Sequence, residues 1–157
     1  MKTDKSGFTL IEIVIVVAIV GLLATLGSLG YTKAMHNSRV NVAQSELEMI
    51  AAATLQLAWD TGKWPNGAWR NQAASGNNEV SDLSDGPLFS ISDADLYPGW
   101  QGPYYEGSLV DPWGQSYYFD SDYRVDGENR IVVGSGGPNC SRINRYDSDN
   151  IYVFLDD

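Results

Sequence analysis

The sequence predicts an α+β protein in which one long N-terminal helix packs on a small antiparallel β-sheet, with a long loop between them. Three observations lead to this prediction. Residues 13–32 are uncharged, the residues after them keep a helical period, and three short segments near the C-terminus have strand composition. A length of 157 residues is typical of one domain with an appended segment, which excludes a large multidomain enzyme.

The uncharged run is long enough to cross a bilayer. As a helix rising about 1.5 Å per residue, residues 13–32 span a hydrocarbon core of roughly 30 Å. A buried helix of a soluble core is the alternative, but a domain of this size seldom encloses a helix that is apolar on every side. A secretory signal peptide is disfavoured because the run exceeds the usual core of about 7–15 residues. We expect a retained membrane and assembly helix over residues 8–32.

Residues 33–60 are expected to continue as an amphipathic helix. Apolar positions recur there at steps of three and four residues, whereas Gln44, Glu46 and Glu48 fall largely outside this stripe. No proline interrupts the pattern, and Gly62 is the expected end of the helix. The expected stripe consists of Val40, Ala43, Leu47, Ile50, Thr54 and Leu57.

Residues 61–157 are expected to form the globular part. Between residues 60 and 110, turn-forming residues are frequent and no period persists, which predicts a long surface loop with a short helical turn near Ile91–Leu96. A hairpin connection is expected across Val125–Asn129, because these residues tolerate a positive φ. Strands are predicted at Ser116–Tyr123, Arg130–Ser135 and Ile151–Leu155.

Charge and composition exclude several classes of function. The net charge is −10, and residues 1–58 hold four basic and four acidic residues, so the excess lies wholly in residues 59–157. A surface of this sign does not neutralise phosphates, and we expect no nucleic-acid partner. One cysteine, Cys140, and one histidine, His36, exclude an intrachain disulfide and a four-ligand structural zinc site. Because no catalytic triad or phosphate-binding loop is identified, we do not expect an enzyme.

The N-terminal segment carries a specific motif. Gly7–Glu12 reads Gly-Phe-Thr-Leu-Ile-Glu, follows a short charged hexapeptide and precedes the apolar run. This arrangement resembles the class III signal of type IV pilins and of type II secretion pseudopilins. The resemblance implies a pilin-like fold and a leader, residues 1–7, that a prepilin peptidase removes between Gly7 and Phe8 before methylating the new amino terminus. Glycine at the cleavage site suits this step, because it lets the backbone approach a protease closely.

Glu12 stands at the start of the apolar run. A lone carboxylate there costs several kcal/mol by insertion scales, so it requires a partner. The resemblance implies that this partner is the positively charged amino terminus of a neighbouring subunit, and that Glu12 acts in assembly. The alternative is a glutamate that only reaches back to the lipid headgroups.

The C-terminal part resembles the major, G-type pseudopilin of type II secretion. The motifs that carry this resemblance are Trp64-Pro65, the segment Asp111–Gln115, and Ser135–Asn139 followed by Asp147–Ile151. The resemblance implies an inner-membrane protein with its C-terminal part in the periplasm. There it would polymerise with itself and other pseudopilins, through an inner-membrane assembly platform, into an extracytoplasmic fibre for protein export. A type IV pilin or minor pilin for adhesion or motility is the alternative, although major pilins usually close their C-terminal region with a disulfide.

Calcium is the one cofactor that the resemblance implies. In G-type pseudopilins the loop corresponding to residues 135–150 wraps a calcium ion, and calcium takes carboxylate, amide and backbone oxygens. Ordinary solvated turn residues are the alternative for the two acids of this loop. An EF-hand at residues 120–122 is rejected, because Arg124 and Val125 occupy its third ligand position and its glycine position. The implied ligands are Ser135, Asn139, Asp147, Asp149 and Asn150.

Overall fold

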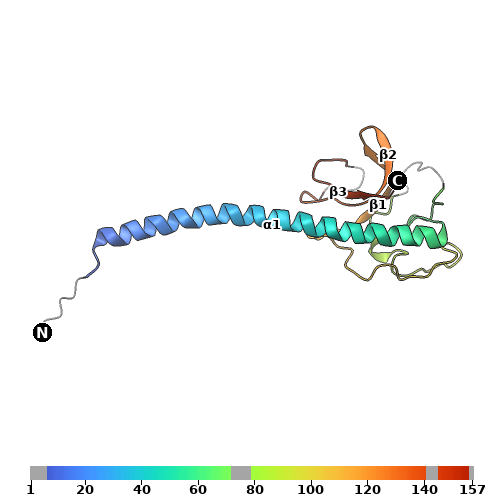
Figure 1. Cartoon of the computed structure of the whole chain (residues 1–157), viewed down its shortest axis with the longest axis horizontal. Coiled ribbons are helices and arrows are strands. Elements are labelled where there is room, and N and C mark those ends of the chain that lie inside the picture. The colour runs from blue at the N-terminus through green and yellow to red at the C-terminus, as the bar shows by residue number, and fades with distance from the viewer. Residues whose placement is uncertain (1–6, 72–78, 141–144, 156–157) are drawn as a thin grey trace. The chain divides into compact units, whose positions relative to one another are not determined.

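The computed structural model describes residues 7–71, 79–140 and 145–155, apart from the side chains of residues 27–29. Most of the predicted leader, residues 1–6, lies outside the described residues. One long helix and a small antiparallel sheet confirm the predicted α+β class. The chain divides into two compact units, Met1–Ser38 and Arg39–Asp157. The elements are α1 (Leu10–Thr61), the 3-10 helix η1 (Leu83–Asp85), β1 (Tyr118–Val125), β2 (Glu128–Ser135) and β3 (Ile151–Phe154) (Figure 1).

The first unit consists mainly of the N-terminal part of α1. Its large apolar residues between Leu10 and Leu26 are exposed, by 82% at Leu10 and by at least 52% at the others. An 18-residue window of α1 has a mean hydropathy of 2.7, and none of that window is buried. By length and composition this segment is able to cross a membrane, as predicted. An apolar helix that its own chain does not cover needs an apolar environment from outside.

In the second unit, α1 buries one face through the predicted stripe. The side chains of Ala43, Leu47, Ile50, Thr54 and Leu57 are fully buried. Burial of the Thr54 hydroxyl is tolerated because it donates to the Ile50 carbonyl oxygen at 2.8 Å. The interpretation of this segment as an amphipathic helix is therefore confirmed.

The helix ends where the sequence predicts. Its last residue is Thr61, and Gly62 follows with a φ of +72°. Only glycine adopts this left-handed conformation readily, so Gly62 turns the chain out of the helix. The Gly62 N–H still donates to the Ala58 carbonyl oxygen at 3.0 Å, which closes the last turn.

The sheet is antiparallel with the order β1-β2-β3. The predicted hairpin is confirmed: β1 and β2 are joined by Asp126 and Gly127, whose φ angles are 52° and 88°. The first strand begins at Tyr118 and not at the predicted Ser116, because Ser116 forms an isolated bridge with Val110 outside the sheet. Since the turn takes only two residues, β2 starts earlier than predicted, at Glu128.

A bulge interrupts the pairing of β1 with β2. Asp120 is paired with Val132, but Tyr123 is paired with Arg130, so β1 has one residue more than β2 over this stretch. Bulges re-aim side chains and are frequent beside functional sites. The acids Asp120 and Asp122 lie in this bulged stretch.

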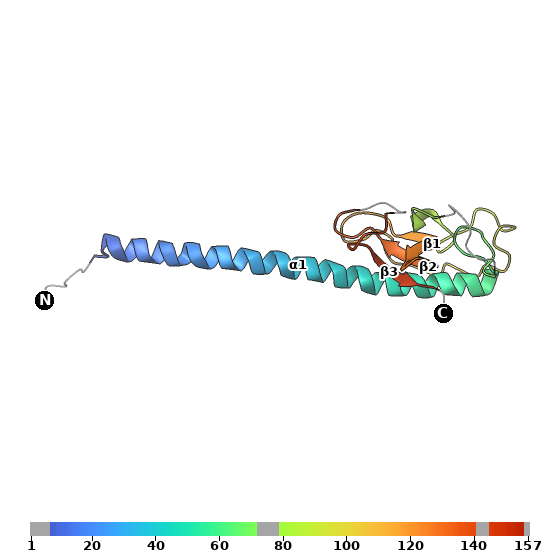
Figure 2. The ribbon, with the colours of Figure 1, turned by 90° about the horizontal axis from the view of Figure 1, so that it is seen from above.

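The prediction of a surface loop between residues 60 and 110 is wrong in part. Three short strands are too small to cover the buried face of α1, so the loop supplies much of the core. In Figure 1 the strands lie on one side of the C-terminal part of α1 and much of the preceding segment lies on the other, whereas in the view of Figure 2 most of both lies on the same side of the helix. The buried side chains from this segment are Trp64, Leu83, Leu88, Tyr97, Tyr105 and Leu109.

The predicted helical turn at Ile91–Leu96 is also wrong. Asp93 Oδ1 accepts the backbone N–H groups of Asp95 and Leu96 at 2.9 and 3.3 Å, and this turn ends before Pro98. An aspartate that bonds its own following backbone favours a turn over a helix. The short helix of the described loop is instead η1, where the Ser84 N–H donates to Asp82 Oδ1 at 2.8 Å.

Candidate functional site

The predicted processing and assembly residues lie at the start of α1. Gly7, Phe8 and Thr9 precede the helix in non-helical backbone, and the Phe8 side chain is 86% exposed. The Thr9 N–H and hydroxyl donate to Glu12 Oε2 at 2.8 and 2.7 Å, and the Glu12 N–H donates to Thr9 Oγ1 at 3.4 Å. This reciprocal arrangement is a capping box. The sequence-based prediction did not include this local role of Glu12, although the Thr-x-x-Glu spacing indicates it.

Asp111 ties the loop to the end of β2. Its buried carboxylate accepts the N–H groups of Trp113 and Gln115 at 3.0 and 2.9 Å through Oδ1, and the hydroxyl of Ser135 through Oδ2. The Ser135 Oγ also accepts the Gly137 N–H at 3.0 Å. In this structure the hydroxyl of Ser135, one of the predicted calcium ligands, is therefore engaged by its own chain.

The other four predicted calcium ligands lie around one turn. Asn139 Nδ2 donates to Asp147 Oδ2 at 3.1 Å, and the Asp149 N–H donates to Asp147 Oδ1 at 3.1 Å. Asn150 Nδ2 donates to the Tyr123 hydroxyl at 3.0 Å, while Asn150 Oδ1 is buried without a hydrogen-bond partner. A carboxylate, a second acid and an orphaned amide oxygen form a donor set that fits a hard cation.

Gly137 holds the two ends of this turn together. Its φ is +67°, and a Cβ at this position would lie 1.9 Å from the Asp149 carbonyl oxygen. Only glycine permits so close an approach of two backbone segments. Residues 141–144, between the two ends, lie outside the described residues.

A second acidic group, which the sequence-based prediction did not include, lies at the outer edge of β1. Val80 and Phe119 exchange two backbone hydrogen bonds of 2.9 Å and form an isolated antiparallel bridge. Antiparallel pairing therefore sets Glu79 opposite Asp120. Asp122 lies in the bulged stretch of β1, and its N–H donates to Asp120 Oδ1 at 2.9 Å. We call Glu79, Asp120 and Asp122, whose carboxylate oxygens lie within 4.8 Å of one another, the acidic cluster.

Burial and like charge act together on the acidic cluster. Asp120 is fully buried, and Glu79 Oε1, Asp120 Oδ2 and Asp122 Oδ1 are buried without a hydrogen-bond partner. Desolvation raises the pKa of Asp120 to about 7, and the side chain of Asp122 and the charge of Glu79 contribute to the same effect. The Asp122 N–H lowers this pKa and only partly offsets the rise. This all-oxygen set has the donors to hold a metal ion.

Sequence spacing did not reveal the cluster because its members come from separate segments. The structure places the rejected EF-hand residues, 120–122, in β1 and not in a calcium-binding loop. Their third partner, Glu79, arrives only through the bridge between Val80 and Phe119. The sole local signal was a pair of acids two positions apart in a predicted strand.

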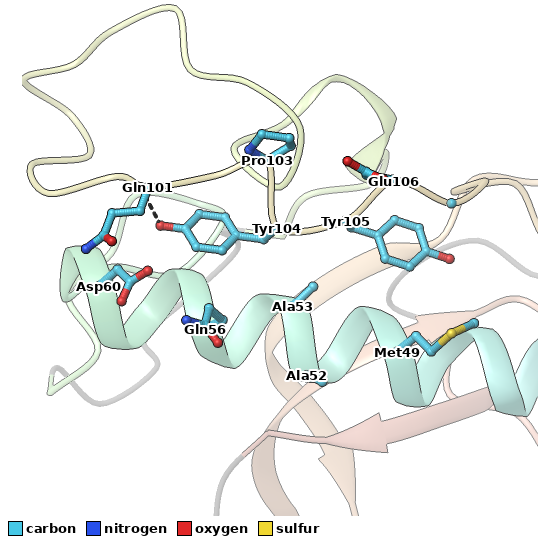
Figure 3. A pocket seen from close by; sticks show the side chains of 11 residues that line it. Met49, Ala52, Ala53, Gln56, Asp60, Gln101, Pro103, Tyr104, Tyr105 and Glu106 are labelled. Carbon is cyan, nitrogen blue, oxygen red and sulfur yellow. Dashed lines mark hydrogen bonds between the residues drawn. The ribbon is translucent and has the colours of Figure 1, made fainter.

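An open groove of 830 Å³ lies between α1 and residues 101–107 (Figure 3). In Figure 3 the ring of Tyr104 lies over the last turns of α1, near Gln56 and Asp60. The Tyr104 hydroxyl accepts the Gln101 N–H at 2.8 Å, which fixes this ring. The described lining contains no histidine, cysteine, serine or lysine.

Comparisons with known proteins agree with the N-terminal geometry. Residues 2–28 match the model of the prokaryotic N-terminal methylation motif. This stretch contains Gly7, Phe8 and the capping box of α1.

Similarity to known proteins extends over the rest of the chain. The chain is 29% identical to the type II secretion system core protein G of Xanthomonas campestris, over 96% of this chain and 92% of that protein. The core protein G of Pseudomonas aeruginosa is 29% identical over 75% of each chain. A type IV major pilin protein, PilE1 of Neisseria gonorrhoeae, is 35% identical over 53% of this chain and 48% of its own. No solved structure matches at a significant level. The predicted resemblance is thus confirmed.

The raised pKa of Asp120 predicts how the metal-free protein responds to pH. Because the folded state holds this proton up to about pH 7 and the unfolded chain releases it near pH 4, stability falls as pH rises through this window. The loss is at most about 4 kcal/mol. Asp120→Asn should abolish it, leaving the variant more stable than the wild type at pH 8 in EDTA. Melts followed by near-ultraviolet circular dichroism at pH 4.5 and 8 measure the difference.

The matched control is Asp126→Asn, which removes one exposed carboxylate at the hairpin tip. This variant should follow the wild type at both pH values. Tyr118, Tyr123 and Tyr146 also lie close enough to feel the charge of Asp120, but their pKa values are raised and they do not ionise in this window. The same pH dependence in the wild type and in Asp120→Asn would contradict the assignment.

Proposed function

We propose, on the premise that the chain is a pilin-like protein similar to the type II secretion system core protein G, that it is a structural subunit of a pseudopilus for type II protein secretion. In this role it polymerises through the N-terminal part of α1. The observation that carries the proposal is the similarity to core protein G across 96% of the chain. The pilin and minor fimbrial relatives match only 53–55% of the chain, so adhesion or motility is the less supported role.

Location and partners follow from the same proposal. Before assembly the apolar part of α1 anchors the subunit in the inner membrane, with the acidic second unit in the periplasm. Lys2 and Lys5 favour a cytoplasmic leader, where a prepilin peptidase cuts between Gly7 and Phe8. The partners are other copies of the chain, further pseudopilins and an inner-membrane assembly platform. The excess of negative charge argues against nucleic acid.

Glu12 is proposed to align neighbouring subunits. Both hydrogen bonds that Glu12 accepts from Thr9 reach Oε2, so neither occupies Oε1. Cleavage after Gly7 leaves Thr9 and Glu12 in the mature chain, and the new amino terminus at Phe8 carries a positive charge. A carboxylate that its own cap keeps in place at the membrane is suited to pair with that charge on a neighbour.

The C-terminal turn is proposed to hold calcium, as the resemblance implies. Asp147, Asp149, Asn139 and Asn150 would supply side-chain or backbone oxygens. Ser135 Oγ donates to Asp111 and accepts from Gly137, so it would have one remaining lone pair to offer. Bound calcium would fix a turn that the chain otherwise closes with a few hydrogen bonds. Because two of these residues are neutral amides, we expect a dissociation constant of about 10⁻⁴–10⁻³ M.

The processing step can be tested by mass. Intact-mass analysis of the membrane-extracted protein should show loss of residues 1–7 and gain of one methyl group. Gly7→Val should retain the leader, because a branched side chain obstructs close approach to the protease. A full-length, unmethylated wild-type protein in the membrane would refute the proposed maturation.

Two substitutions at Glu12 separate its charge from its capping role. Glu12→Gln keeps a cap, since glutamine also serves in a capping box, whereas Glu12→Leu removes both cap and charge. If the charge aligns subunits, both variants should insert and be processed normally but form at least about tenfold fewer fibres. Fibres sheared from cells and counted by immunoblot give the measurement. Normal assembly of Glu12→Gln would mean that only the cap matters.

Calcium binding by the C-terminal turn predicts a calcium-dependent melting temperature. Saturation at a hundredfold excess over the dissociation constant stabilises a one-site protein by about 2.7 kcal/mol. Asp147→Asn should lose this increment at the turn, while Asp126→Asn at the exposed hairpin tip should keep it. Thermal melts of the full chain in detergent, with millimolar calcium and with EGTA, decide the matter. Equal calcium-induced shifts of the melting temperature in the two variants would mean that Asp147 is an ordinary turn residue and not a calcium ligand.

A further inference from the structure

The acidic cluster brings three carboxylates from separate backbone positions to one point. The bridge between Val80 and Phe119 fixes Glu79 opposite Asp120, and Asp122 lies two residues after Asp120 in β1, with its N–H bonded to Asp120 Oδ1. Like charges directly opposite one another across a strand pair are unfavourable. Backbone pairing, not chance side-chain placement, therefore holds these acids together.

Burial raises the energetic cost of placing these carboxylates together. Asp120 has no exposed surface, and its Oδ2 lacks a hydrogen-bond partner. One oxygen each of Glu79 and Asp122 is also buried and unpartnered. A buried charge requires a counter-charge, and each unpartnered oxygen requires a donor or a cation. Within the part of the chain that the structure describes, these buried oxygens have no hydrogen-bond donor.

The chemistry of the donors selects the cation. Calcium binds six to eight oxygens at about 2.3–2.6 Å, so oxygens on opposite sides of it are about 4.6–5.2 Å apart. The three carboxylates, within 4.8 Å of one another, fit this span. An all-carboxylate set without histidine or cysteine favours calcium or magnesium over zinc and other transition metals.

We propose that Glu79, Asp120 and Asp122 form a calcium site that is separate from the C-terminal turn. Waters and nearby backbone carbonyl oxygens would complete the coordination, because three side chains supply too few ligands alone. Calcium is preferred to magnesium, which demands a near-ideal octahedron that fixed β-strand backbones are poorly placed to supply. The proposal goes beyond the fibre role and does not depend on it.

The new site adjoins the C-terminal turn through aromatic side chains. The Tyr123 ring lies 4.8 Å from the Tyr146 ring, measured between centroids, and the Tyr123 hydroxyl accepts from Asn150 of the turn. Two calcium ions on either side of Tyr123 would staple β1 to the loop before it and to the turn after β2. The chain has only one cysteine for this purpose, so metal is its available cross-link.

The test counts bound calcium in the full, processed chain in detergent after treatment with a chelator. Equilibrium dialysis against millimolar calcium is carried out on the wild type and on Asp120→Asn, Glu79→Gln, Asp147→Asn and Asp126→Asn. The first two variants should each bind one equivalent less than the wild type. Asp147→Asn and Asp126→Asn should retain that equivalent, and a tenfold excess of magnesium should not displace it.

Melting temperatures in EGTA show whether a variant binds less calcium only because it is misfolded. Asp120→Asn should melt at the same or a higher temperature than the wild type without calcium, because it relieves repulsion, and should gain less on addition of calcium. Glu79→Gln, at a partly exposed position, provides a second variant with the same expectation. Unchanged stoichiometry in both variants overturns the proposal, since the cluster would then hold only a proton. Loss of all bound calcium in Asp147→Asn also overturns it.

Discussion

The buried face of α1 between Ala43 and Ala58 is the constraint on which the second unit depends. A helix that buries so much apolar surface must be covered, and a sheet of three short strands covers only part of it. The long segment before β1 completes the cover by placing Leu83, Leu88 and Tyr97 in the core. Its course is thus fixed by hydrophobic burial even though little of it is regular secondary structure.

The positions of the acidic cluster and of Asp111 follow from the way the segment before β1 covers α1. Once Leu83 and Phe119 are buried, Val80 is held beside β1 and pairs with it. Each of the two acids brought opposite one another there must then be neutralised or remain a source of instability. Asp111 illustrates the opposite solution, because its buried carboxylate is satisfied by three hydrogen bonds from its own chain.

Features determined locally were predictable from the sequence. The membrane segment, the amphipathic stripe, the end of α1 at Gly62 and the Asp126-Gly127 turn all depend on composition, period or a required φ. The role of the loop in the core was not predictable, because its apolar residues have no period. The acidic cluster was missed for a related reason: contact between Glu79 and Asp120 depends on a non-local bridge that no spacing encodes. The cap that Glu12 forms within its own helix is also local, because the Thr-x-x-Glu spacing encodes it, but the sequence-based prediction gave Glu12 only a role between subunits.

The tip of the β1–β2 hairpin is a site where evolution can insert residues. Asp126 and Gly127 are exposed, and a side chain at Gly127 would meet no atom within 4 Å. Insertions at such a tip lengthen the chain without disturbing the core, as long as the flanking register is kept. The tip is thus a place where homologues can differ in length and where a fluorophore or epitope can be inserted while the buried face of α1 remains covered.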